Sequence, residues 1–230
     1  MLTRERVIMK NSLRLASVSL LAAAIMAPAA QAEITANVAL TTDYVWRGTS
    51  QNQEDPALQG GFDYGHDSGF YAGVWGANVN FGGASTELDF YAGWGTELES
   101  GVGVDVGIIR YAYQGSDIAS KLDFTEVYVG VSYSGLGFMY SFGDELGDQY
   151  EISYGYDLEN VSLAAAYGSY DTSGNDDDYN YYSAGVSGSF GGTSDLGWDV
   201  SYYGNSSEAD ALFGEEAADG RLVFTLSKEF

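Results

Sequence analysis

The chain has 230 residues and a formal net charge of −24, with 31 glycines, two prolines and no cysteine. This acidity argues against nucleic acid and anionic lipid headgroups as electrostatic partners, and the lack of cysteine excludes a disulfide framework. Aromatic residues make up 15% of the chain and alternate with polar ones, which excludes intrinsic disorder and favours a protein built of strands.

The first 32 residues have the pattern of an export signal. Four basic residues flank the start of an apolar run at 15–27, and a small-x-small triplet follows at 30–32. We expect residues 1–32 to be a signal peptide that is cleaved after export through the Sec route; Met9 is an alternative start. The mature chain would begin at Glu33, and losing four basic residues and one acidic residue would bring its net charge to −27.

Nearly every segment after the signal alternates with a period of two residues, which indicates strands with one apolar face. In 148–158, for example, Tyr, Ile and Leu occupy one face and Gln, Glu, Ser and Asp the other. Most segments have about the 9–11 residues that a tilted strand needs to cross a bilayer, and no apolar run is long enough for a transmembrane helix. The predicted strands lie near residues 36–48, 57–64, 69–81, 86–96, 102–113, 121–133, 136–142, 148–157, 160–168, 179–190, 195–204 and 220–230.

The connections between these strands alternate between short and long. The short ones are turns rich in Gly, Asp, Asn and Ser, at 65–68, 97–101, 134–135, 157–160 and 191–195. The others lie at 49–55, 114–120, 143–147, 169–178 and 205–219, with a shorter member at 82–85. Short periplasmic turns that alternate with longer external loops are typical of outer-membrane barrels, and an even strand number returns both termini to the periplasm.

Alternation alone also fits a soluble β-protein, so the fold class depends on further features. Aromatic residues gather near predicted strand ends, as an interface girdle requires: Tyr44, Trp46, Tyr71, Trp75, Tyr133, Trp198 and Tyr202. A strand in hydrocarbon must have all its backbone groups paired, so the sheet must close on itself. We therefore predict an all-β fold, a transmembrane antiparallel up-and-down β-barrel of about twelve strands. It would span residues 33–230 as one domain, in contact with the lipid of a Gram-negative outer membrane.

The stretch at 42–81 resembles the TorF-type family of proteobacterial proteins with a predicted porin role. The matching positions are Thr42, Asp43, Tyr44, Arg47, Gly48, Ser50, Gln51, Pro56, Ala57, Gln59, Gly60, Gly69, Tyr71, Gly73, Trp75, Asn78 and Val79. The resemblance implies an outer-membrane barrel, and assembly machinery that recognises the last strand, which ends at Phe230. It brings no established substrate.

If the apolar faces meet lipid, the opposite parity lines the lumen. The candidate pore-lining residues are Asp43, Arg47, Gln59, Asp63, Glu87, Asp89, Asp105, Arg110, Glu126, Glu151, Asp199 and Arg221. Arg110 belongs to this set only if a bulge switches the parity between Val106 and Ile109. Asp43 and Arg47 would lie about 13 Å apart on one strand, so each is expected to pair across to a neighbouring strand.

These features predict a porin that lets small polar or cationic solutes pass through a narrow acidic lumen. The alternative is a non-conducting structural or adhesin-like barrel that acts through its external loops. An enzyme is not expected: the one histidine, His66, lies in a short turn, and no carboxylate pair stands out. No metal or cofactor is expected either, because the acidic stretch at 171–182 lacks the sixth-position glycine and twelfth-position glutamate of a calcium loop.

Overall fold

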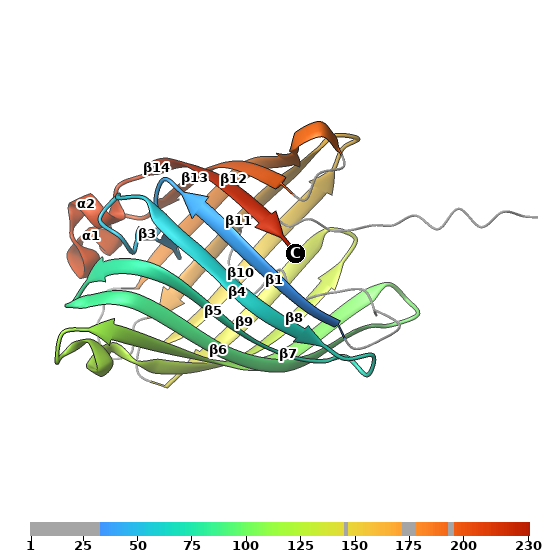
Figure 1. The fold of residues 1–230 in the computed structure, drawn as a ribbon, viewed down its shortest axis with the longest axis horizontal. Coiled ribbons are helices and arrows are strands. Elements are labelled where there is room, and N and C mark those ends of the chain that lie inside the picture. The colour runs from blue at the N-terminus through green and yellow to red at the C-terminus, as the bar shows by residue number, and fades with distance from the viewer. Residues whose placement is uncertain (1–32, 145–146, 172–177, 193–195) are drawn as a thin grey trace, which may run out of the picture.

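A computed structural model describes residues 33–144, 147–171, 178–192 and 196–230. The expected signal peptide and residues 172–177, which are half of the acidic stretch at 171–182, lie outside these residues. Twelve antiparallel strands close into a barrel in the order β1-β14-β13-β12-β11-β10-β9-β8-β7-β6-β5-β4 (Figure 1). The predicted fold class, an up-and-down barrel of about twelve strands, is therefore confirmed.

Apart from the first one, the barrel strands lie close to the alternating segments predicted from the sequence. They are β1 (Glu33–Thr41), β4 (Ala57–Gly65), β5 (Phe70–Phe81), β6 (Ala84–Glu97), β7 (Val102–Gly115), β8 (Phe124–Tyr133), β9 (Leu136–Gly143), β10 (Asp148–Asp157), β11 (Val161–Asp171), β12 (Tyr179–Ser189), β13 (Leu196–Asn205) and β14 (Arg221–Glu229). The connections hold a small hairpin of β2 (Val45–Trp46) and β3 (Thr49–Ser50), and the short helices η2 (Ala119–Leu122), η3 (Phe190–Gly192), α1 (Glu208–Phe213) and α2 (Glu215–Ala218). Among the described residues, no helix is long and apolar enough to cross a membrane.

One junction, between β1 and β14, closes the barrel. Its register runs only from Asn37 to Thr41 on β1, whereas β1 pairs with β4 along its whole length. Beyond that register, Ala36 and Phe230 exchange both backbone hydrogen bonds, at 3.3 and 2.9 Å. We call this junction the seam.

The two ends of the barrel differ in their connections. The end where β1 begins and β14 finishes, here called the turn end, carries the short turns: the one predicted at 65–68 lies at 66–69, and the one predicted at 134–135 lies there. The opposite loop end carries the two longest connections, 42–56 and 206–220, and the short helices α1 and α2 lie there (Figure 1).

The outer face of the barrel is apolar over most strands. On β8, Val127, Val129 and Val131 are 51%, 41% and 45% exposed, while the residues between them are buried or half-buried. Phe62, Phe138, Ile152, Leu163, Leu222 and Phe224 are exposed in the same way on other strands. An apolar surface of this extent is costly in water and matches the hydrocarbon-facing band of a membrane barrel.

Two sequence predictions about individual strands are wrong. The first strand ends at Thr41 and does not reach residue 48. On β5, Trp75 is expected in the aromatic girdle at the membrane interface, yet it is 6% exposed and lies inside. Both faces of β5 carry aromatic residues, and Phe70 is the one that points outward.

Candidate functional site

The connection at 42–56, here called the inward hairpin, folds into the barrel at its loop end (Figure 1). Its buried side chains are Asp43, Tyr44, Arg47, Thr49, Ser50, Gln51 and Asn52. The chain reverses at Arg47 and Gly48, whose φ angles are +47° and +81°. A Cβ on Gly48 would lie 2.9 Å from the Cβ of Tyr181, so both the conformation and the close approach require glycine here.

Arg47 crosses the lumen and anchors the hairpin to β8. Its Nη1 and Nη2 donate to the two carboxylate oxygens of Glu126 at 2.8 and 2.7 Å, and both side chains are buried. The guanidinium also lies over the rings of Trp46 and Tyr170, 4.1 and 4.9 Å from their centroids. Burial disfavours its charge, but the Glu126 carboxylate outweighs this and raises the pKa of Arg47 well above its ordinary value.

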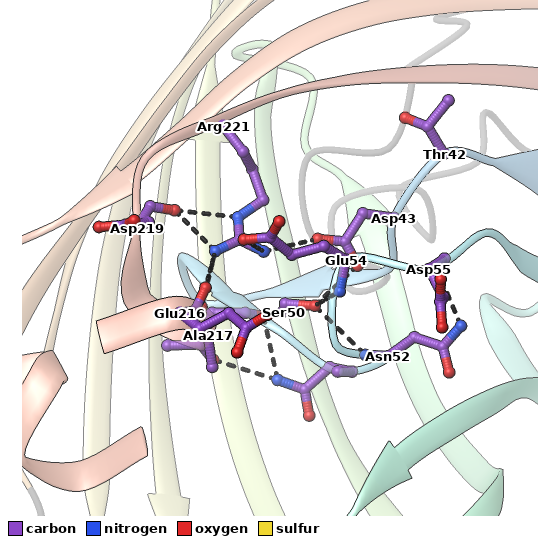
Figure 2. A network of polar contacts seen from close by, with 12 residues as sticks. Thr42, Asp43, Ser50, Asn52, Glu54, Asp55, Glu216, Ala217, Asp219 and Arg221 are labelled. Atoms are coloured by element: carbon purple, nitrogen blue, oxygen red, sulfur yellow. Dashed lines mark hydrogen bonds and ion pairs between the residues drawn. The ribbon is translucent and has the colours of Figure 1, made fainter. Parts of the chain in front are cut away.

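A second ion pair holds the base of the hairpin to β14. Arg221 Nη1 donates to Asp43 Oδ2 at 2.9 Å, and Ser50 Oγ donates to Asp43 Oδ1 at 2.8 Å (Figure 2). Arg221 also donates through Nη2 to the carbonyl oxygens of Glu216, Ala217 and Asp219. Burial raises the pKa of Asp43, and the hydrogen bond from Arg221 opposes that rise. Arg221 thus joins the hairpin to the helical connection between β13 and β14.

Further contacts connect the hairpin to other walls. The Tyr44 hydroxyl donates to Glu87 Oε1 at 2.9 Å, and its ring packs edge-on against Trp75 at 5.3 Å. On the opposite wall, Asn205 Nδ2 donates to the Gly48 carbonyl at 2.9 Å. The hairpin therefore contacts β5, β6, β8, β11, β13 and β14 from inside the loop end of the barrel.

Most of the predicted pore-lining residues face the interior. Asp43, Arg47, Glu87, Asp89, Asp105, Glu126, Glu151 and Asp199 are buried, and Gln59, Asp63 and Arg221 are half-buried on inward positions. Asp43 and Arg47 lie on the inward hairpin, although the sequence placed them on a strand. The pore-lining role of the set stays a prediction.

Arg110 is different, because it points outward. Its side chain is 45% exposed, and its Nη2 lies 3.4 Å from Asp123 Oδ2. Ile109 and Tyr111 are the inward residues here, at 2% and 3% exposure. The register of β7 is continuous through this region, so the expected bulge is absent from the described pairing and Arg110 does not line the lumen.

Tyrosine hydroxyls accompany the inward carboxylates. Tyr71 donates to Asp105 at 2.9 Å and also contacts the Tyr128 hydroxyl. Tyr181 donates to Glu151 at 3.1 Å, and the same arrangement joins Tyr91 to Asp63. Sequence reasoning missed Tyr71 and Tyr91, because it assigned most aromatic residues to the lipid face. Aromatic residues at both parities of one strand are the signal that could have identified them.

Asp89 and Glu87 form a pair of carboxyl groups on the inward face of β6. Both residues are buried, at 0% and 1% exposure, and a side-chain hydrogen bond joins their carboxyl groups. His66, the one candidate base for nucleophilic chemistry, is exposed in the turn between β4 and β5, where its Nδ1 lies 2.7 Å from Ser68 Oγ. It does not reach the lumen.

Comparison with solved structures finds the same fold among porins. The KdgM porin has 8% sequence identity and a TM-score of 0.59, over 85% of this chain and 98% of that one. A KdgM porin in complex with disordered oligogalacturonate gives 8% identity and a TM-score of 0.56, over 86% and 97%. At this identity the likeness shows the fold alone.

Comparison at the level of sequence places the chain in a family without a known activity. No curated protein matches the sequence. The profile described as "Bacterial protein of unknown function (Gcw_chp)" matches residues 26–230, which is most of the chain. The chain therefore belongs to the Gcw_chp family of bacterial proteins.

Proposed function

We propose that this protein is a porin-like channel of a Gram-negative outer membrane, which lets small polar or cationic solutes pass through a narrow acidic lumen. It would reach that membrane through the Sec route after cleavage of residues 1–32, and assembly machinery would recognise the strand ending at Phe230. Membrane lipid would surround the apolar outer face. The TorF-type resemblance at 42–81 supports the same role.

The balance of inward charge carries this proposal. Seven buried carboxylates face the interior: Asp43, Glu87, Asp89, Asp105, Glu126, Glu151 and Asp199. Against them, the described part of the chain buries one arginine, Arg47, and half-buries Arg221, and both already pair with carboxylates. Because the low-dielectric wall strengthens this excess negative field, it would attract cations and repel anions.

The same balance argues against carrying over the ligand of the KdgM complex. That porin is described with oligogalacturonate, a chain of sugar acids. An acidic oligosaccharide would meet like charge throughout this interior, and each unpaired contact would be unfavourable. A cationic or neutral polar solute fits the lining better.

The inward hairpin would set the width of the pathway. Twelve strands enclose more space than an eight-stranded barrel filled by side chains and less than a sixteen-stranded porin. The hairpin occupies much of that space at the loop end, so we expect a small unit conductance.

Conductance and reversal potential in a planar bilayer test the proposal. Under a KCl gradient, refolded protein is expected to conduct in small steps and to favour K⁺ over Cl⁻. A heat-dependent shift in gel mobility confirms that the sample is folded. Silent bilayers from folded protein would refute the channel, whereas anion preference would refute the acidic pathway.

A structural or adhesin-like barrel is the second candidate, and the filling of the lumen by the hairpin favours it. In that case the external loops would carry the function. Deleting residues 206–219 would then abolish adhesion while the twelve wall strands still close, although the carbonyl contacts that Arg221 makes with this connection would be lost.

A further inference from the structure

The helical connection between β13 and β14 packs onto the inner surface of the barrel at the loop end. Ala209 on α1 and Ala218 on α2 are 0% and 3% exposed, and they form one apolar cluster with Tyr170 on β11 and with Tyr179 and Tyr181 on β12. All three tyrosines are buried and lie on the inward faces of their strands. The connection therefore covers the loop end of β11 and β12 from the inside.

The same cluster continues into the inward hairpin. Trp46 packs against it, with its ring centroid 6.0 Å from that of Tyr170, and α2 lies close to β3 of the hairpin. Trp46 also contacts Tyr111 on β7 and Phe124 on β8, at 5.9 and 6.1 Å between ring centroids. The helical connection and the hairpin thus form one packed layer that reaches from β7 and β8 to β11 and β12.

Arg221 holds the helical connection to the hairpin. Its guanidinium donates to Asp43, lies 3.4 Å from Glu54 Oε1, and donates to three carbonyl oxygens of the connection (Figure 2). The helices α1 and α2 carry four carboxylates and no basic residue. Arg221 is therefore a positive group between two acidic segments, and without it their like charges would face each other with less compensation.

Toward the turn end, water reaches the inner wall. Ala164 on β11 points inward between Gly155 and Gly185 of the neighbouring strands, and all three residues are half-buried. Ala77 also points inward, on β5, but it belongs to the apolar cluster around Tyr44 of the hairpin and is only 4% exposed. The packed layer at the loop end thus separates a water-accessible part of the lumen from the exterior.

We propose that the α1–α2 connection is a lid that closes the lumen at the loop end, and that Arg221 makes the lid and the inward hairpin move together. A solute that enters from the turn end leaves at the loop end only when this lid lifts. The inference rests on the proposed function, since a lid matters only where solutes cross the barrel.

Two alanines on one short helix test the lid by single-channel recording. Ala209→Glu places a carboxylate where the structure leaves no exposed surface, so α1 should lift from the tyrosines. Ala211→Glu adds the same charge at an exposed position of α1 and is the matched control. We expect the unit conductance of Ala209→Glu to be roughly twofold or more above that of Ala211→Glu. Equal unit conductance would overturn the lid. If Ala209→Glu does not fold, Phe213→Ala, which removes the ring 5.5 Å from Tyr179, takes its place.

Thiol labelling in detergent tests the coupling without requiring current. The chain has no cysteine, so a single introduced one reports on its own position. A trimethylammonium methanethiosulfonate is expected to modify Ala164→Cys readily and Ala77→Cys about tenfold more slowly. Combining Ala77→Cys with Ala209→Glu should speed its modification, whereas combining it with Ala211→Glu should not. Continued protection of Ala77→Cys beside Ala209→Glu would overturn the coupled movement, and equal rates at both cysteines in the wild-type background would overturn the closed loop end.

The two assays separate this inference from the channel itself. A barrel that stays silent in every variant, but whose Ala77→Cys is released by Ala209→Glu, would reject the channel alone. A conducting barrel in which Ala209→Glu changes neither the conductance nor the labelling would reject the lid alone. A heat-dependent shift in gel mobility confirms that each variant is folded before it is measured.

Discussion

Replacing Arg47 with methionine should release the inward hairpin from the far wall of the barrel. The variant keeps a long side chain but leaves Glu126, which is fully buried, without its counterion. Removing one partner of a buried ion pair costs about 3–5 kcal/mol, mostly through the uncompensated charge that remains. The contacts with Trp46 and Tyr170 add roughly 0.5–2 kcal/mol. We therefore expect the free energy of unfolding to fall by about 4 kcal/mol or more.

Equilibrium unfolding by urea in lipid vesicles measures that loss, and single-channel recording measures its consequence. Because Arg47 is the contact that carries the hairpin across to β8, its loss should raise the unit conductance. The double variant Arg47→Met/Glu126→Gln also removes the carboxylate that the single variant leaves uncompensated. It should lose less stability than the sum of the two single variants, with a coupling of roughly 1–3 kcal/mol.

Two results would refute this reasoning. A loss of less than about 1 kcal/mol in Arg47→Met would mean that the pair behaves like a solvated surface ion pair. Additive losses in the double variant would mean that Glu126 is not left uncompensated when Arg47 is removed.

The remaining predictions concern the hairpin and the outer wall. Gly48→Ala should lower the free energy of unfolding by about 1–3 kcal/mol in the same urea titration, because the φ of +81° and the 2.9 Å approach to Tyr181 both penalise a side chain. Arg221→Met removes the group that counteracts the effect of burial on Asp43, so the pKa of Asp43 should rise further. A carboxyl group whose pKa is raised in the folded state lowers the free energy of unfolding as the pH rises through that pKa. The variant should therefore lose more stability at neutral pH than at about pH 3.5. Arg110→Gln should leave conductance and selectivity unchanged, because this side chain lies outside the lumen; a shift in reversal potential would contradict its outward position.

The barrel could be predicted from the sequence because its signals are local. Alternation along strands such as β8 and β10 and the turns at 66–69 and 134–135 need no knowledge of distant residues. Where both faces of a strand carry apolar or aromatic residues, the alternation no longer indicates which face points outward. Phe70 and Tyr71 are both aromatic, and only their positions in the closed barrel show that Phe70 points outward.

The site could be predicted only in part, since long-range contacts form it. The alternation of Thr42, Tyr44 and Trp46 looks like a continued strand, and the reversal depends on a positive φ at Arg47 that no local pattern specifies. The partner of Arg47, Glu126, lies 79 positions away in the sequence. The sequence could therefore predict that Arg47 pairs across to another strand, but not that its partner is Glu126.

The seam between β1 and β14 gives the barrel an order of assembly. Every other neighbouring pair of wall strands is consecutive around the barrel and linked by at most the 15 residues of 42–56 or 206–220, so it can pair soon after its two strands emerge. Thr41 and Thr225 instead meet across a separation of 184 residues, so pairing them carries the largest loop-closure entropy. Because its register is also short, we expect the seam to pair last when the barrel assembles and to separate first when the barrel is destabilised.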